Sequence, residues 1–374
     1  MIAPQRDLTP GVVEIEDGRV VRVRAGSPHR ADVVVRSGIL APGLIDLQIN
    51  GAAGVDFLSC DSEAQFGRAL RYLASTGVTG FLPTLISAQS DHLREAMMRW
   101  RRFATLGGGP RILGVHLEGP YLNPAFCGAH NPRHLRAADP TECAALLSVA
   151  PGLVRIVTLA PELRGALQVM RVARDRGCVV SVGHTNATGD EARLAFAAGA
   201  SMVSHLFNAM RPIHHREPGV IIAALEDPEV TVSLIADLVH VHASLVRLTV
   251  AVKGWRRVAL VTDALAAAGT KQRITRLGGR KVRVTDAPRL SDGTLAGSVL
   301  SLDQAVRNAV AIGVPLRAAV LMASAVPAAA LGRRDLGQIA PGAWADFAIF
   351  DRALRPVATY VAGEQVYARA RPSH

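Results

Sequence analysis

The middle of the chain repeats one pattern. A short apolar run is followed by a longer stretch in which apolar side chains recur at three- and four-residue spacing, as in an amphipathic helix. Strands that alternate with helices pair in parallel, and eight such units predict a closed (β/α)8 TIM-type barrel of the α/β class over residues 41–340. The eight runs are LIDLQIN (44–50), GFLPTLIS (80–87), ILGVHLEG (112–119), RIVTLAP (155–161), VVSVGHT (179–185), MVSHLFN (202–208), VSLIADLVH (232–240) and VALVTDA (258–264).

An open, doubly wound sheet is the alternative arrangement of such units. It would place a glycine-rich, phosphate-binding turn after an early strand. The triplet Gly107-Gly108-Gly109 precedes a predicted strand instead, so we interpret it as a loop that ends a helix. The pattern therefore favours the barrel.

Both ends of the chain show the two-residue alternation of β-strands. It occurs in VVEIEDG, RVVRVRAG and ADVVVRSG near the start, and in ADFAIFD, PVATYVAG and EQVYA near the end. We predict that residues 1–40 and 341–374 together form a small β-sandwich domain. The segment between Asp263 and Ser301 is an insertion, which we expect to lie as a hairpin or loop over the barrel mouth.

Composition argues against several classes of protein. The chain carries 42 Lys and Arg against 31 Asp and Glu, a net charge of +11, but the basic residues are scattered, and aromatic residues make up only 4%. A nucleic-acid partner is therefore not expected, whereas a positive field suits a small anionic substrate. The four cysteines form no CxxC pair, which argues against a zinc ribbon or a disulfide framework.

A membrane partner is not expected either. The most apolar stretch, residues 308–331, is interrupted by Pro315, Arg317 and Pro327 and is too short to span a bilayer. The N-terminus lacks the basic start and apolar run of a signal peptide. We therefore expect a cytoplasmic protein.

Three ionisable residues end different predicted strands: Glu118, His184 and His205. The carboxyl ends of barrel strands converge on one mouth, where such enzymes have their active sites. A single histidine at the end of a strand is more often structural. One carboxylate and two imidazoles at the same mouth form a common catalytic zinc set with an open position, so we predict one divalent metal ion per subunit, with zinc expected.

Asp263 ends the last predicted strand, beside this set. A carboxylate there can accept a proton from water and return it to a leaving group. The alternative is a cap on the alanine-rich segment that follows. His240, which follows Asp237 at the end of the seventh predicted strand, is placed to polarise a carbonyl. His242 is two residues further on, so in an extended chain its side chain would point the same way as that of His240. We interpret His116, two residues before Glu118, as a core residue or as one that supports the ligand residues from behind.

These residues lie in motifs that closely resemble the N-acetylglucosamine-6-phosphate deacetylases of the amidohydrolase superfamily. The resemblance spans residues 41–347. Its motifs are APGLIDLQINGAAGVDF, HLEGPYLNP with GAHNP, SVGHTNAT, SHLFNAM with HHREPG, IADLVHVH, LVTDALAAAG, GTLAGSVLSLDQAVRN and GQIAPGAWADF.

The resemblance implies hydrolysis of the acetamide of N-acetylglucosamine 6-phosphate to glucosamine 6-phosphate and acetate. By motif position, the metal ligands are Glu118, His184 and His205, and the acid–base residue is Asp263. His240 would bind the acetyl oxygen. Further substrate contacts are implied for Ala129, His130, Asn208, Ala209, Leu295, Ala296 and Gly297.

The resemblance also implies a homodimer in which Arg216 binds the phosphate in the neighbouring subunit's site. From the residues alone, the cluster His214-His215-Arg216 is equally compatible with a solvated loop.

Two departures qualify the match. Many amidohydrolases have His-x-His at the end of the first strand, where this chain has Gln48-Ile49-Asn50, so we expect one metal rather than two. Leu238 replaces a usual glycine beside His240, which bears on the sugar contacts. Three alternatives stay open: N-acetylgalactosamine 6-phosphate as substrate, a cyclic amide as substrate, and a catalytically silent barrel.

Overall fold

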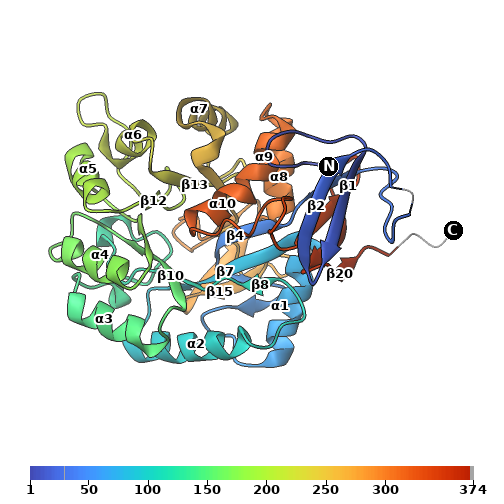
Figure 1. Cartoon of the computed structure of the whole chain (residues 1–374). Helices are drawn as coiled ribbons and strands as arrows, with labels where there is room; N and C mark the ends of the chain where they lie inside the picture. Colours follow the sequence, from blue (N-terminus) through green and yellow to red (C-terminus); the bar gives the residue numbers. More distant parts are fainter. Residues whose placement is uncertain (29, 371–374) are drawn as a thin grey trace.

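The computed structural model describes residues 1–28 and 30–370, and eight parallel strands form its centre (Figure 1). Their order is β14-β13-β12-β11-β10-β9-β7-β4, and each of the eight predicted runs contributes one of them, so the (β/α)8 prediction is confirmed. The strands are β4 (Leu44–Ile49), β7 (Val78–Ile86), β9 (Val115–Glu118), β10 (Val154–Leu159), β11 (Val179–Val182), β12 (Met202–Val203), β13 (Thr231–Ile235) and β14 (Val258–Val261).

The barrel closes where β4 meets β14. The backbone N–H of Asp263 donates to the carbonyl of Gln48 at 2.8 Å, and that of Asn50 donates to the carbonyl of Ala264 at 2.8 Å. Just below, the hydroxyl of Thr262 donates to the buried carboxylate of Asp46 at 2.6 Å. These contacts fix the ends of the first and last strands against each other.

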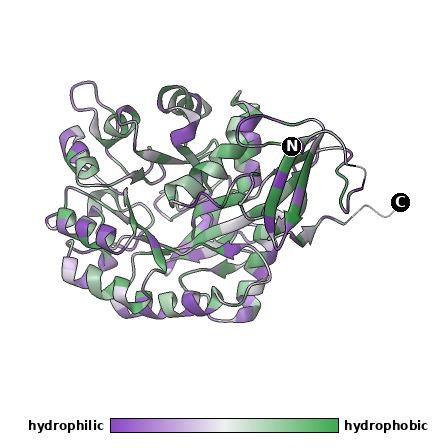
Figure 2. Ribbon diagram, in the orientation of Figure 1, coloured by the Kyte–Doolittle hydropathy of each residue, from purple (hydrophilic) through white to green (hydrophobic). Residues whose placement is uncertain are grey.

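Helices surround the strands and turn their apolar faces inward (Figures 1 and 2). In α2, for example, buried Leu93, Ala96, Met97, Trp100 and Phe103 recur at three- and four-residue spacing. The helices are α1 (Glu63–Ser75), α2 (Ser90–Phe103), α3 (Pro140–Val149), α4 (Ala166–Asp175), α5 (Gly189–Ala197), α6 (Gly219–Glu226), α7 (Ala243–Lys253), α8 (Leu302–Ala311), α9 (Leu316–Met322) and α10 (Ala325–Ala330). Of the helices described, none has the length and apolarity needed to cross a membrane.

The two ends of the chain meet beside the barrel. A four-stranded antiparallel sheet joins β3 (Ile39–Pro42) to β18 (Phe347–Phe350), β19 (Pro356–Val361) and β20 (Glu364–Ala368). The hairpin of β1 (Gly11–Glu16) and β2 (Arg19–Ala25) contributes Val20 to a small hydrophobic cluster with Ile339, Ala345 and Phe347. The division of the chain into domains at residues 40 and 341 remains a prediction.

The third strand predicted near the start is wrong. Residues 31–38 form no strand, and Val33, Val34 and Val35 are exposed. The pairing of β3 with β18 begins only at Ile39. An alternating run becomes a strand only where a sheet edge is available for its backbone, and the four residues of β18 are already paired with residues 39–42.

The insertion after β14 folds as a three-stranded antiparallel sheet. Its strands are β15 (Ile274–Leu277), β16 (Arg280–Val284) and β17 (Pro288–Arg289). The hairpin between β15 and β16 brings Leu277 and Arg280 to the same cavity as the strand-end residue Glu118. This hairpin is therefore a wall of the barrel mouth.

Candidate active site

A cavity of about 610 Å³ lies at the carboxyl ends of the barrel strands. It collects residues from seven of the predicted motifs, far apart in the sequence. Among those that line it are Glu118, Ala129, His130, His184, His205, Asn208, Ala209, His240, Asp263, Leu295 and Gly297.

Glu118, His184 and His205 converge in this cavity. Oε1 of Glu118 lies 2.9 Å from Nε2 of His205 and 3.3 Å from Nε2 of His184, and the two Nε2 atoms lie 3.1 Å apart. All three residues are buried, and their ligand atoms lie within 4.8 Å of one another. This spacing of one carboxylate and two imidazole donors matches the protein ligand set of a catalytic divalent metal.

The donors also have the chemistry that a metal needs. The carbonyl of Phe126 lies 2.9 Å from Nδ1 of His184, which leaves Nε2 of that ring for a cation. Burial lowers the pKa of His184 to about 4, so the imidazole is neutral and its lone pair is available. The residues present therefore fit a divalent cation.

Glu118 is ionised in this environment. Burial alone would raise its pKa, but hydrogen bonds with His130, His184 and His205 outweigh that effect and hold the pKa well below its usual range. An anionic carboxylate between imidazoles supplies negative charge for a cation at the buried site.

Asp263 is held beside this cluster by two amides. Asn50 Nδ2 donates to Asp263 Oδ1 at 2.6 Å, and Gln48 Nε2 donates to the same oxygen at 3.4 Å. Gln48 Nε2 also donates to Glu118 Oε1 at 2.7 Å. Burial, followed by the negative charge of Glu118, raises the pKa of Asp263 to about 6. The carboxylate is thus suited to exchange protons near neutral pH.

The same amides lie at the end of the first barrel strand, β4. Amide N–H groups donate to carboxylates and do not bind metals. Gln48 and Asn50 therefore orient the carboxylates of Glu118 and Asp263 rather than add ligands, which favours a single metal.

Several residues that line the cavity have left-handed backbones, and three of them are ionisable. The φ angles are 49° at His184, 32° at His205 and 49° at Asp263. Side chains other than glycine adopt this region at a cost, and such residues cluster at functional sites. The turns that end β11, β12 and β14 thereby aim these three side chains into the mouth.

His240 and His130 each have a fixed ring. Nδ1 of His240 lies 2.6 Å from Asp237 Oδ2. Nδ1 of His130 lies 2.9 Å from the hydroxyl of Ser87 and accepts from the Ser87 backbone N–H at 3.3 Å, while its Nε2 lies 3.5 Å from Glu118 Oε2. Both rings are therefore anchored through Nδ1; Nε2 of His240 is left for a ligand, whereas Nε2 of His130 faces Glu118.

Two predicted contact residues do not line this cavity. Ala296 is fully buried, between Leu295 and Gly297, which do line it. Arg216 is exposed, with Nη1 2.8 Å from Nε2 of His215. The structure describes one chain, so the proposed role of Arg216 in a neighbouring subunit stays a prediction.

Two further residues named in the sequence analysis, His116 and Leu238, support the fold around the cavity and do not line it. His116 lies below the mouth, with its ring nitrogens 3.0 Å from the carbonyl of Leu47 and 2.7 Å from the hydroxyl of Thr158. Leu238 has a φ of 66° and packs against the hydrophobic core. Its backbone thus keeps the left-handed geometry that suits the usual glycine.

Sequence reasoning missed several supporting residues. Arg280 donates to the carbonyl of His130 at 3.1 Å, which ties the inserted hairpin to the His130 loop. Glu162 accepts from the hydroxyl of Thr185 at 2.5 Å and from the backbone N–H of Asn186 at 2.7 Å, which anchors the turn after His184. Spacing gives no signal for these contacts, because they join loops that follow different strands.

The amidohydrolase family model matches residues 39–366. The chain belongs to the amidohydrolase family. The human N-acetylglucosamine-6-phosphate deacetylase is 38% identical to this amidohydrolase over 97% of this chain and 90% of its own. The N-acetylgalactosamine-6-phosphate deacetylase of Escherichia coli O157:H7 is 36% identical over 94% of this chain and 93% of its own.

Solved structures agree with these relatives. A mutant of the N-acetyl-D-glucosamine-6-phosphate deacetylase from Mycobacterium smegmatis, in complex with N-acetyl-D-glucosamine-6-phosphate, is 38% identical to this amidohydrolase. The two structures superpose with a TM-score of 0.91, covering 95% of this chain and 94% of the other. The resemblance drawn from the motifs is confirmed.

Proposed function

We propose that this amidohydrolase hydrolyses the acetamide of N-acetyl-D-glucosamine 6-phosphate to D-glucosamine 6-phosphate and acetate. The observation that carries the proposal is the placement of Asp263 beside the Glu118–His184–His205 cluster in one cavity. Relatives of at least 35% identity that act on this substrate add support.

In the proposed mechanism, Glu118, His184 and His205 would hold one zinc ion. Such an ion supplies Lewis acidity, which activates water and polarises an amide carbonyl. Asp263 accepts a proton from the water molecule that attacks the acetyl carbon. It then gives that proton to the sugar nitrogen as the C–N bond breaks, so that acetic acid and a free amine are formed. The remaining proton of the acid passes through solvent to the amine, which leaves acetate and an ammonium group on the sugar.

His240 and His130 would orient the substrate. With Nδ1 bound to Asp237, His240 has Nε2 left for the acetyl oxygen. His130, anchored by Ser87, would contact the sugar together with Ala129. Asn208 and Ala209 line the same cavity and would offer backbone groups to the substrate.

The phosphate contact completes the proposal. Arg216 does not reach its own cavity, and its loop is exposed, so we assign it to the site of a second copy in a homodimer. A guanidinium binds phosphate through two parallel charge-assisted hydrogen bonds. The net charge of +11 also favours an anionic substrate.

The C4 epimer is the second candidate substrate, because one relative at 36% identity is an N-acetylgalactosamine-6-phosphate deacetylase. Acetate release from the two epimers, each measured with zinc-loaded protein, decides between them. The proposal expects the larger kcat/KM with the glucosamine epimer. A larger value with the galactosamine epimer reassigns the substrate, and no acetate from either refutes the deacetylase assignment.

A further inference from the structure

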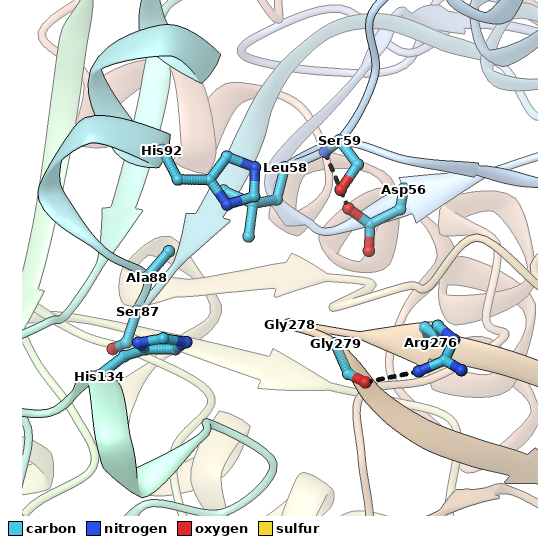
Figure 3. A pocket seen from close by; sticks show the side chains of 10 residues that line it. All are labelled: Asp56, Leu58, Ser59, Ser87, Ala88, His92, His134, Arg276, Gly278 and Gly279. Atoms are coloured by element: carbon cyan, nitrogen blue, oxygen red, sulfur yellow. Dashed lines mark hydrogen bonds between the residues drawn. The ribbon is translucent and has the colours of Figure 1, made fainter.

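A second cavity, of about 440 Å³, adjoins the candidate active site (Figure 3). It lies between the segment that leads into α2 and the turn Gly278-Gly279 at the tip of the inserted hairpin. No residue of the proposed reaction lines it. Its walls carry the ionisable residues Asp56, His92, His134 and Arg276.

Two opposite charges face this cavity without pairing. One carboxylate oxygen of Asp56 accepts the backbone N–H of Ser59 at 3.1 Å, and burial raises the pKa of Asp56 to about 6. Arg276 donates from Nη1 to the carbonyl of Gly279 at 2.8 Å, and no carboxylate in the described chain lies within ion-pair distance of it. A perturbed carboxyl and a free cation in one cavity are typical of a ligand site.

The two cavities share a wall. Ile86 and Leu277 line the candidate active site, whereas the next residues, Ser87 and Gly278, line the second cavity. Gly278 has a φ of 54°, and a Cβ atom there would lie 2.7 Å from Cδ1 of Ile86. The absence of a side chain lets the hairpin close tightly on the end of β7, so the wall is thin.

Ser87 connects the second cavity with the reaction site. Its hydroxyl lies 2.9 Å from Nδ1 of His130, and its backbone N–H donates to the same atom. His130 is a proposed substrate contact and lies 3.5 Å from Glu118. A ligand that hydrogen-bonds to the hydroxyl of Ser87 would therefore disturb the anchor of His130.

We propose that the second cavity binds the amino-sugar phosphate product and thereby slows turnover. This inference rests on the proposed function. The product carries both an ammonium group, which Asp56 would bind, and a phosphate, which Arg276 would bind; both residues line this cavity. The substrate has a neutral acetamide in place of the ammonium and so lacks the partner of Asp56. The product is also released next to the shared wall.

Calorimetry tests the site directly, with zinc-loaded enzyme and glucosamine 6-phosphate at pH 7, where the carboxyl of Asp56 is ionised and the amine of the product is protonated. We expect two classes of site on the wild type and one class on Arg276→Gln and on Asp56→Asn, the lost class being weakened at least tenfold. Arg283→Gln, an exposed arginine of β16 that lines neither cavity, should keep both classes. Inorganic phosphate lacks the ammonium group and glucosamine lacks the phosphate. Each should therefore bind to the second class of site at least tenfold more weakly than the product does.

Binding of the substrate is measured with the Asp263→Asn variant, because this variant should not turn the substrate over. The substrate should show one class of site. A single class of site for the product on the wild type, or two classes retained in Arg276→Gln, would overturn the proposal.

Initial rates test the consequence for catalysis. We expect added product to lower kcat as well as to raise KM in the wild type, and only to raise KM in Arg276→Gln, with Arg276→Lys restoring the effect on kcat. Purely competitive inhibition in the wild type would refute the coupling through Ser87. If the protein releases no acetate, the proposed function fails, whereas the calorimetric result still decides the second site.

Discussion

The carboxylate of Asp237 and the ring of His240 form a closed pair, with Oδ2 2.6 Å from Nδ1. The other oxygen of Asp237 accepts the backbone N–H groups of Val239 and His240, at 2.9 and 2.8 Å. Both oxygens of Asp237 are thus engaged with the turn and the ring of His240. The carboxylate fixes the orientation of the ring and leaves Nε2 as the nitrogen that faces a ligand.

The first prediction concerns this pair. Asp237→Ala should lower kcat/KM about 10-fold or more, the usual scale for losing an orienting partner, and zinc content should not change. Asp237→Asn keeps an acceptor but not the charge and should recover only part of the loss. Asp175→Ala, an exposed aspartate at the end of α4, is the control. Wild-type kcat/KM in Asp237→Ala would show that His240 needs no partner.

The second prediction concerns the metal. Elemental analysis should give one zinc per chain, and Glu118→Gln should lose it. A chelator should lower the Tm of the wild type, because a ligand that binds only the folded state stabilises it, and should leave the Tm of Glu118→Gln unchanged. Two equivalents of metal in the active protein would contradict the role of Gln48 and Asn50 as orienting amides.

The third prediction separates chemistry from binding at Asp263. Asp263→Asn should lose at least ~10²-fold in kcat, the scale of a removed general acid–base. It should keep its metal, because Asp263 is not one of the three clustered ligands, and Asn50 can still donate to the new amide oxygen. Acetate release and metal analysis on the same sample check both points. Near wild-type turnover would mean that Asp263 only ends its strand.

The fourth prediction concerns Arg216 and the dimer. Arg216→Ala should raise KM for the phosphorylated sugar and change little for unphosphorylated N-acetylglucosamine, which offers no phosphate to the guanidinium. Mixing Arg216→Ala with Asp263→Asn should restore part of the activity, because one site of a mixed dimer regains both groups. Confirmed subunit exchange without restored activity would place Arg216 outside the neighbouring site.

The fifth prediction concerns Asp46, which is fully buried below the mouth. Burial raises its pKa to about 7 from an ordinary 3.8. Between these two values the folded protein keeps a proton that the unfolded chain releases, so the free energy of unfolding falls as pH rises from about 4 to 7. The full effect is on the order of 4 kcal/mol.

Asp46→Asn should lack this contribution. Urea unfolding of the variant and the wild type across this range, each with saturating zinc, should show the variant gaining relative stability as pH rises. A constant difference between the two would show that Asp46 is already ionised at pH 4.

The barrel and its mouth could be predicted because both follow from repetition. Nearly every run ends in a polar or ionisable residue, and parallel closure brings the strand ends together. The meeting of Glu118, His184, His205 and Asp263 could therefore be predicted without knowledge of their loops. The strand predicted over residues 31–38 was wrong for a related reason: alternation describes the segment itself, not whether a sheet edge is free to receive it.

The supporting contacts could not be predicted in this way. The contact of Gln48 with Glu118 depends on how two strand ends are staggered, and the anchoring of His130 by Ser87 depends on the path of a loop. The left-handed turn at His184 leaves no signature, since histidine rarely adopts it. These features depend on tertiary distances that sequence spacing does not encode.

The closure of the barrel also orders the assembly of the site in time. Gln48 and Asp263 are 215 residues apart, and their contact lies between the first and the last barrel strand. A chain made from its N-terminus contains Glu118, His184 and His205 well before Asp263 is synthesised. The carboxylate of Asp263, the proposed proton carrier, takes its place only when β14 docks beside β4. A chain that ends before β14 therefore contains the three clustered residues but lacks the group assigned to the proton.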